Sequence, residues 1–169
     1  MNYFELFEIP EHLLFDAEKL QEKFYELSRK YHPDFYSQSS EQEQQEVLEK
    51  SSQINKAFQI FKNLDLTIAY VLKENNFLED DEKYSLPNNF LMEMMEFNES
   101  LVDAQMDDDL EKVKLVKQEI KVVNDNLWNS IKSIIQDYSG ENKTTEKLQT
   151  LKDYYFKKKY LNRILEGLE

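Results

Sequence analysis

Apolar residues recur every three or four positions along most of the chain, which is the spacing of helices that bury one face. The first long stretch of this pattern has its apolar face at Leu20, Phe24, Leu27 and Tyr31. Asp16 stands where a side chain can cap the start of such a helix. Pro33 predicts an end near Tyr31, because proline lacks a backbone N–H and disfavours helical geometry at the preceding residue.

A second amphipathic helix is expected from about residue 41 to residue 62, after an exposed loop at residues 35–40. Its apolar side carries Val47, Ser51, Ile54, Phe58 and Phe61. The two helices then form an antiparallel hairpin with His32, Pro33 and Asp34 at its tip. The apolar segment 3–7 is expected to close over the base of this hairpin, and a short helix around residues 66–73 extends the unit.

The second half of the chain predicts three further helices, which we expect to form a bundle. Asn88 or Asn89 is expected to cap the first of them, whose seam is Phe90, Met94, Phe97, Leu101 and Ala104. A long helix follows over residues 110–138, with Gly140 as its expected stop. Thr144 or Thr145 then caps a last helix, which places Leu151, Tyr154, Leu161, Leu165 and Leu168 inward. Lys158 falls on the same inner side, so its ammonium must reach the surface or the register must shift.

Together these patterns predict an all-α fold with two domains. The charged segment 79–87 ends in Pro87 and reads as a linker, which places the first domain at residues 1–78 and the three-helix bundle at residues 88–169. The chain contains only 2 Gly and 3 Pro among 169 residues. Turns are therefore few, which argues against sandwiches and barrels.

Composition removes several classes of function. The absence of cysteine excludes disulfides, thiolate metal sites and cysteine nucleophiles, and two histidines are too few for a histidine-rich metal site. We expect no metal and no cofactor. A net charge of −13 argues against nucleic acid as the main ligand and favours a basic partner surface. Because we find neither a leader peptide nor an apolar run long enough to span a bilayer, we expect a cytoplasmic protein that does not bind membranes.

The tripeptide at residues 32–34 is the sharpest local motif. Pro33 fixes the exit from a helix, while His32 and Asp34 present a hydrogen-bonding group and a charge on an exposed loop. A catalytic dyad of His32 and Asp34 is disfavoured, since no nucleophile or second base lies nearby in the sequence. The plain alternative is an exposed loop histidine without a role.

In this context the sequence resembles the J-domain family and, within it, the HscB family of co-chaperones for iron–sulphur cluster assembly. The J-domain resemblance depends on segment 3–7, on residues 31–34 between two amphipathic helices, and on segment 54–58. Residues 90–93, Glu96 and Glu99, followed by a helical bundle, are specific to the HscB family. Residues 1–78 are thereby identified as a J-domain.

The resemblance implies a regulatory role and no enzymatic activity. The loop and the helix before it would dock on a DnaK-type heat-shock chaperone, in its HscA form, and stimulate its ATP hydrolysis. The chaperone-binding residues would be His32, Pro33, Asp34, Lys19, Lys23, Arg29 and Lys30, with Asn55 and Lys56 from the following helix. The bundle would hold an IscU-like cluster scaffold and present it to the chaperone.

The first bundle helix also carries more apolar residues than one buried seam can use. Leu91, Met92 and Met95 lie off the seam, and Glu96, Glu99 and Asp103 form an acidic stripe beside them. Such a face suits a partner whose apolar surface has a basic rim. In the last helix, Phe156 and Tyr160 point away from the inner stripe and would extend this patch.

By resemblance, the scaffold-binding residues are Leu91, Met92, Met95, Glu96, Glu99, Asp103 and Phe156. The plain alternatives are a buried core for the leucine and the methionines and a solvated face for the acidic stripe. Two rival functions also stay open. One is a J-protein that delivers a different client outside the cluster pathway, and the other is a helical adaptor whose His-Pro-Asp motif has no chaperone partner. An enzyme is a distant third.

Overall fold

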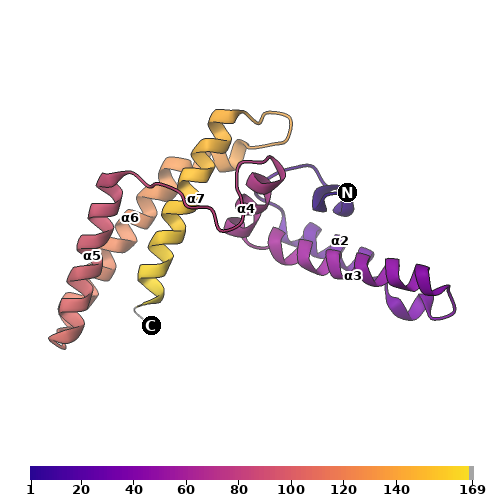
Figure 1. Cartoon of the computed structure of the whole chain (residues 1–169), viewed down its shortest axis with the longest axis horizontal. Helices are drawn as coiled ribbons and strands as arrows, with labels where there is room; N and C mark the ends of the chain where they lie inside the picture. Colours follow the sequence, from indigo (N-terminus) through magenta and orange to yellow (C-terminus); the bar gives the residue numbers. More distant parts are fainter. Residues whose placement is uncertain (168–169) are drawn as a thin grey trace. The chain divides into compact units, whose positions relative to one another are not determined.

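The computed structural model describes residues 1–167 and is built of helices (Figure 1). In chain order these are α1 (Tyr3–Phe7), α2 (Ala17–Lys30), the 3₁₀ helix η1 (Pro33–Tyr36), α3 (Glu41–Phe61), α4 (Leu64–Glu74), α5 (Asn88–Met106), α6 (Leu110–Asp137) and α7 (Thr145–Glu166). Within residues 1–167 the only β-type pairing is an isolated antiparallel bridge between His12 and Ser139. The predicted all-α fold is confirmed. Leu168, expected on the inner face of the last helix, lies outside the described residues.

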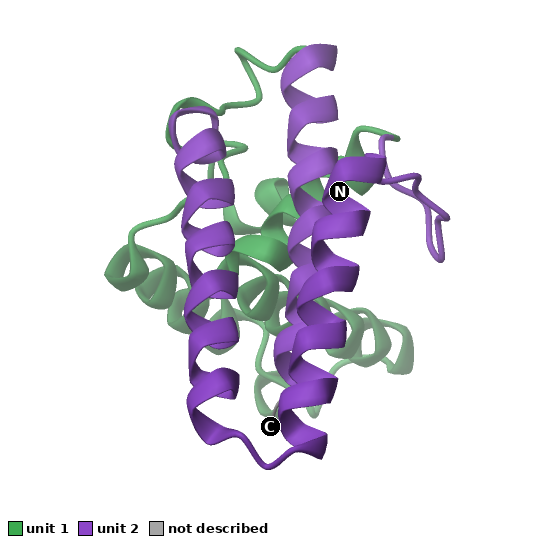
Figure 2. Cartoon of the chain, turned by 90° about the vertical axis from the view of Figure 1, so that its left-hand side faces the viewer, with its two compact units in different colours: residues 1–76, 135–144 green, residues 77–134, 145–169 purple. Residues whose placement is uncertain are grey.

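The chain divides into two compact units, coloured separately in Figure 2. Unit 1 comprises residues 1–76 together with residues 135–144, and unit 2 comprises residues 77–134 with the helix that follows residue 144. The corner between α6 and α7 therefore groups with the N-terminal hairpin, although the sequence pattern placed it in the second half. No helix within residues 1–167 is both long and apolar enough to cross a lipid bilayer.

Side-chain caps set the limits of the unit 1 hairpin. Asp16 accepts a hydrogen bond from the backbone N–H of Lys19 at 3.0 Å, which confirms the predicted start of α2. Tyr31 closes α2 directly before the His-Pro-Asp turn (residues 32–34). Ser40 caps α3 in the same way through the N–H of Glu43 at 3.2 Å. The segment between the helices is more ordered than the predicted loop, because η1 adds one 3₁₀ turn after His32.

Aromatic rings close the base of the hairpin, as the apolar segment 3–7 predicted. The rings of Phe4 and Phe7 pack on Phe61 of α3, with centroids 5.0 and 5.5 Å apart. Leu13 and Ile68 are fully buried in the same unit. Burial of these large aromatic side chains adds to the stabilisation that the aliphatic core residues of the unit provide.

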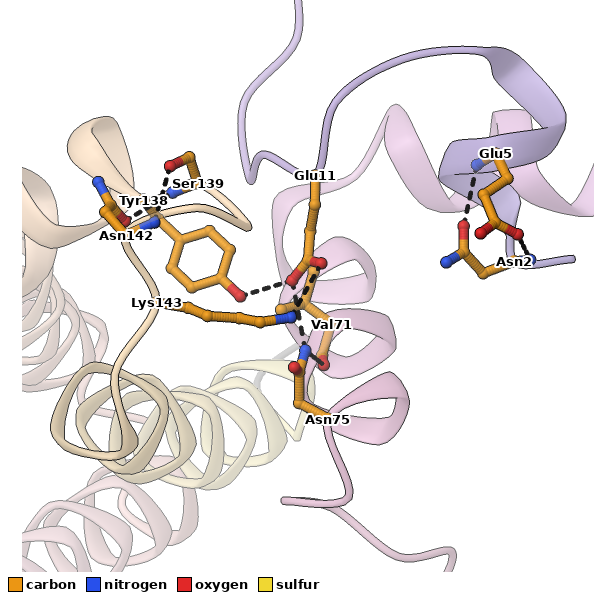
Figure 3. A network of polar contacts seen from close by, with 9 residues as sticks. All are labelled: Asn2, Glu5, Glu11, Val71, Asn75, Tyr138, Ser139, Asn142 and Lys143. Atoms are coloured by element: carbon orange, nitrogen blue, oxygen red, sulfur yellow. Dashed lines mark hydrogen bonds and ion pairs between the residues drawn. The ribbon is translucent and has the colours of Figure 1, made fainter.

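A polar network joins three distant parts of unit 1 around the carboxylate of Glu11 (Figure 3). The hydroxyl of Tyr138 donates to Glu11 Oε1 at 2.7 Å, and Asn75 Nδ2 donates to the same oxygen at 3.3 Å. Lys143 Nζ lies 3.3 Å from Glu11 Oε2. His12 Nδ1 lies 3.0 Å from the carbonyl oxygen of Tyr138. The α6–α7 corner is thus bound to the loop between α1 and α2.

Gly140 serves this contact, and the prediction that it stops the long helix is wrong. Its φ is not positive, and α6 has already ended at Asp137. The backbone N–H of Gly140 donates to the carbonyl of Glu11 at 2.9 Å, and a Cβ placed on Gly140 would lie only 3.1 Å from the Cβ of Glu11. A side chain at this position would therefore crowd Glu11, because the two backbones approach each other closely.

Unit 2 is a three-helix bundle with one core drawn from all its helices. The core consists of Phe90, Met94 and Leu101 of α5, Val116 and Ile120 of α6, and Leu161 and Ile164 of α7. Lys158, which the pattern placed inward, is half-buried and its ammonium donates to Asn124 of α6. The predicted asparagine cap of α5 is wrong: Pro87 is the N-cap residue, without a side-chain hydrogen bond, and Asn88 is already helical.

Candidate functional site

The His-Pro-Asp turn lies at the tip of the hairpin, where α2 has ended and η1 begins (Figure 1). His32 has an extended backbone (φ −74°, ψ 126°) and Pro33 is the first residue of η1, so the proline ring starts the 3₁₀ turn without losing a hydrogen bond. The carbonyl of His32 accepts from the N–H of Phe35 at 3.1 Å. The turn is therefore a defined structure, held by its own backbone.

The imidazole of His32 is oriented by the same turn. Its Nδ1 accepts the backbone N–H of Asp34 at 3.3 Å, which requires the proton to sit on Nε2 when the ring is neutral. The carboxylate of Asp34 is 3.7 Å from Nδ1, too far for a hydrogen bond, and its side chain is 89% exposed. His32 and Asp34 thus offer one N–H donor and one free carboxylate, with no bond between their side chains that would make a dyad.

Two aromatic side chains flank the turn and were not among the predicted site residues. The hydroxyl of Tyr36 donates to the carbonyl of Lys30 at 3.0 Å, which joins η1 to the last turn of α2. The ring of Phe35 is exposed and meets His32 edge-on, with centroids 6.0 Å apart. A tyrosine three residues after a helix-ending proline was the available signal in the sequence.

The predicted basic residues are spread along the whole hairpin. Arg29 and Lys30 are exposed in the last turn of α2, next to the His-Pro-Asp turn, whereas Lys19 is exposed in its first turn. Asn55 and Lys56 are exposed in the second half of α3, and Asn55 Nδ2 donates to the carbonyl of Ser51 at 3.1 Å. At 1.5 Å per residue, Lys19 and Arg29 are separated by about 15 Å along α2. Only Arg29 and Lys30 adjoin the turn.

Lys23 differs from the other basic residues because its charge is already paired. Its Nζ lies 2.6 Å from Glu8 Oε2 and 3.2 Å from Glu26 Oε1. The hydrogen bond between Lys23 and Glu8 holds the pKa of Glu8 below its usual value and raises the pKa of Lys23. The side chain of Lys23 is also 18% exposed, so it has little charge to offer a partner.

A groove with a volume of about 440 Å³ runs beside the tip, and the sequence pattern did not predict it. It is lined by Tyr31, Tyr36, Glu43, Glu46, Val47, Glu49, Lys50 and Gln53. Lys50 Nζ stands 4.6 Å from the centre of the Tyr31 ring. The groove is therefore lined by three glutamates together with a lysine that lies over an aromatic ring.

The second predicted site lies on α5 of unit 2. Met92 and Met95 are 63% and 64% exposed, and Leu91 is half-buried. A buried core position is therefore wrong for both methionines. Glu96, Glu99 and Asp103 are exposed on the same helix. The structure thus brings six of the seven predicted scaffold-binding residues together on one helix.

Phe156 is the exception among those seven residues. It is half-buried, and the ring of Tyr84 from the segment before α5 stacks on it with centroids 4.5 Å apart and planes within 9°. Tyr84 is held in turn by Asp153 and Gln149, each 3.3 Å from its hydroxyl. Burial and the carboxylate of Asp153 raise the pKa of Tyr84. Tyr84 covers one face of the Phe156 ring, so Phe156 is only partly open to extend the patch.

Comparisons with known proteins identify the family of the chain. Residues 86–169 match the HSCB C-terminal oligomerisation domain. The chain is 34% identical over 142 residues to the co-chaperone protein HscB homolog of Vibrio parahaemolyticus, covering 76% of this chain and 83% of that protein. The homolog from Neisseria meningitidis serogroup A is 34% identical over 140 residues, covering 81% and 84%. The chain belongs to the HscB family of co-chaperones.

Solved structures show the same fold. The crystal structure of the human co-chaperone protein HscB matches with a TM-score of 0.77 and 25% identity, over 99% of this chain and 80% of that one. The chaperone HscB from Vibrio cholerae matches with a TM-score of 0.65 and 24% identity over the full length of both chains. The resemblance to the HscB family is thereby confirmed.

Proposed function

We propose that this co-chaperone stimulates ATP hydrolysis by a DnaK-type chaperone of the HscA form and delivers an IscU-like scaffold to it during iron–sulphur cluster assembly. The observation that carries the proposal is the His-Pro-Asp turn. Its backbone is held by η1, its histidine is oriented through Nδ1, and its carboxylate is free. A turn with fixed geometry and open polar groups loses little conformational entropy when a partner binds.

In this proposal the chaperone, and not this chain, carries out ATP hydrolysis. His32 supplies an N–H and Asp34 supplies a charge to the partner, and neither acts on a nucleotide. Arg29 and Lys30 add positive charge beside the turn, which favours an acidic patch on the chaperone. We place the protein in the cytoplasm, a location that suits a co-chaperone with bacterial relatives. No cofactor of the chain's own is required.

The α5 face is the proposed docking site for the scaffold. Exposed methionines beside a stripe of carboxylates fit an apolar surface bordered by basic residues. A chain that holds the scaffold with one unit and the chaperone with the other raises the effective concentration of each for the other. Scaffold and co-chaperone should therefore stimulate the chaperone together more than the sum of their separate effects.

Single-turnover ATP hydrolysis by HscA tests the proposal. The assay compares the wild type with His32→Gln and with Gln38→Ala, a matched control in the same exposed loop, each with and without IscU. His32→Gln should lose stimulation and keep scaffold binding, while Gln38→Ala should match the wild type. If the wild type gives no stimulation, the chain is an adaptor without a chaperone partner. Stimulation without IscU binding would instead indicate a J-protein for a different client.

A further inference from the structure

The α5 helix has two apolar faces, and only one of them belongs to the bundle core. Phe90, Met94 and Leu101 are buried on the inner face. On the outer face the exposed apolar positions continue beyond the predicted scaffold site, with Val102 at 44% and Met106 at 79% exposure. A second apolar face has no use in the folding of the bundle itself.

Helical register aligns these residues in one row. Met92, Met95, Glu99, Val102 and Met106 follow at spacings of three, four, three and four, the repeat of a single helix face. The row runs from Met92 to Met106 over about four turns, or roughly 21 Å at 1.5 Å per residue. The predicted scaffold site occupies only the first part of it.

The size of a specific interface favours use of the whole row. Such an interface takes roughly 20 residues from each partner, whereas the predicted scaffold site has seven, of which Phe156 is partly covered by Tyr84. The continuation supplies Val102, Met106 and, at the start of α6, Leu110, which is also highly exposed. Apolar side chains of this kind favour binding, because a partner that covers them removes their surface from water.

The negative charge along α5 indicates the kind of partner that fits this row. The α5 sequence contains carboxylates at Glu93, Glu96, Glu99 and Asp103 and no lysine or arginine. Asp107, Asp108 and Asp109 add further negative charge between Met106 and Leu110. A second copy of this chain would bring two such acidic rows against each other, which is unfavourable. A partner with an apolar strip and basic residues along its length is favoured.

We infer that the scaffold docks along the full outer face of α5, so that Val102, Met106 and Leu110 form a second half of its binding surface. This inference rests on the proposed function, because it extends the site assigned there. It predicts that the scaffold carries basic groups at two places, opposite Glu99 and Asp103 and opposite the acidic α5–α6 turn. Apolar contact then continues between these two groups of charges.

Methionine methyl signals offer a direct test, because the chain has 5 methionines and four of them lie on α5. The whole chain, labelled with carbon-13 at the methionine methyls, is titrated with IscU and followed by NMR. Signals of the exposed Met92, Met95 and Met106 should shift. Met94, which is fully buried, and Met1, which lies in unit 1, serve as internal references and should stay in place.

Affinity measurements complete the test. The double variant Val102→Gln and Met106→Gln should bind IscU about tenfold more weakly, equivalent to about 1.4 kcal/mol. The matched control is Leu115→Gln, an apolar position on α6 whose exposure lies between those of Val102 and Met106, and it should bind like the wild type. Both sets of changes are on the surface, so helicity should be unchanged.

The possible failures are distinguishable. If the wild type does not bind IscU at all, the proposed function fails and the inference fails with it. If IscU shifts Met92 and Met95 but leaves Met106 in place, and the double variant keeps its affinity, the scaffold site stands and the extension is wrong. If sedimentation shows a dimer that the double variant abolishes, a second copy covers this face and the inference is overturned.

Discussion

The hydroxyl of Tyr138 donates a 2.7 Å hydrogen bond to the carboxylate of Glu11, across 127 positions of the sequence. The Tyr138 side chain is almost fully buried. Its burial, together with the negative charge of Glu11, holds the pKa of Tyr138 well above its usual value. The contact fastens the α6–α7 corner to the loop before α2 inside unit 1. The long helices of the second half thus have their common corner in the unit that carries the His-Pro-Asp turn.

Replacing Tyr138 with phenylalanine should therefore destabilise unit 1. A hydrogen bond to a charged group contributes about 1.5 to 3 kcal/mol, and the variant removes one while keeping the ring in place. Chemical denaturation of the whole chain should show a loss in that range. Tyr25→Phe is the control, because the Tyr25 hydroxyl is exposed and only accepts from Gln21. Equal stability of Tyr138→Phe and the wild type would contradict this account of the corner.

Gly140→Ala should destabilise the same corner by a different mechanism. The added Cβ would lie 3.1 Å from the Cβ of Glu11 and 3.2 Å from Glu11 Oε2, so Glu11 must shift by a few tenths of an ångström. Overpacking of this kind costs about 1 to 3 kcal/mol. Gly167→Ala is the matched control, since the closest atom to its Cβ would be a carbonyl oxygen at 3.5 Å. A Gly140→Ala variant as stable as the wild type would show that the corner adjusts to the added methyl group without a loss in the free energy of unfolding.

Signals between neighbouring residues were enough to predict the hairpin from the sequence. The cap at Asp16 and the proline at position 33 act on their immediate neighbours, so the limits of α2 followed from short-range chemistry. The exposed positions of Met92 and Met95 followed in the same way from the register of one helix. Periodicity alone was enough to separate the two faces of α5.

Contacts between distant segments could not be predicted in this way. Periodicity assigned residues 135–144 to the bundle, because nothing near Tyr138 indicates that its partner is Glu11. The partial cover of Phe156 could not be foreseen, because the ring that stacks on it belongs to Tyr84, in a segment with no periodic pattern. The α5 cap was misplaced for a simpler reason: two neighbouring asparagines suit a cap, whereas the extended backbone of Pro87 begins the helix.

Stability at high pH should depend on Tyr70. Burial raises its pKa to about 12, although the hydrogen bond that its oxygen accepts from the Tyr3 N–H at 2.8 Å works in the opposite direction. The folded chain therefore holds this proton more tightly than the unfolded chain, whose tyrosines ionise near pH 10. The contribution of Tyr70 is complete below about pH 10 and is lost as the pH rises toward the folded value.

Comparison of the wild type with Tyr70→Phe isolates this contribution from those of the other tyrosines. The difference between their free energies of unfolding should shrink as the pH rises above about 10. Tyrosinate absorbance is titrated for both proteins, and the difference between the two curves should show the ionisation of Tyr70 near pH 12. If the difference instead shows Tyr70 ionising near pH 10, Tyr70 is not shielded from water in the folded chain.

The basic residues of α2 should differ in their effect on the chaperone, because their surroundings differ. Arg29 is exposed beside the His-Pro-Asp turn, whereas Lys23 is paired with Glu8 and Glu26. Removing a free charge next to a docking site weakens electrostatic attraction, while removing a neutralised one changes the field little. Arg29→Gln should therefore reduce the stimulation of ATP hydrolysis about threefold at low salt, where charges are poorly screened.

Lys23→Gln should retain most of its stimulation in the same assay, and Lys132→Gln, an exposed lysine of α6, controls for the change in net charge. Raising the salt concentration should bring Arg29→Gln closer to the wild type, since screening removes the attraction from both proteins.

Should Lys23→Gln lose as much stimulation as Arg29→Gln, the pairing with Glu8 would have to open when the chaperone binds. Glu8→Gln should then increase stimulation, because it removes the shorter of the two ion pairs of the Lys23 ammonium in advance. No increase in Glu8→Gln would leave Arg29 and Lys30 as the charges that guide docking.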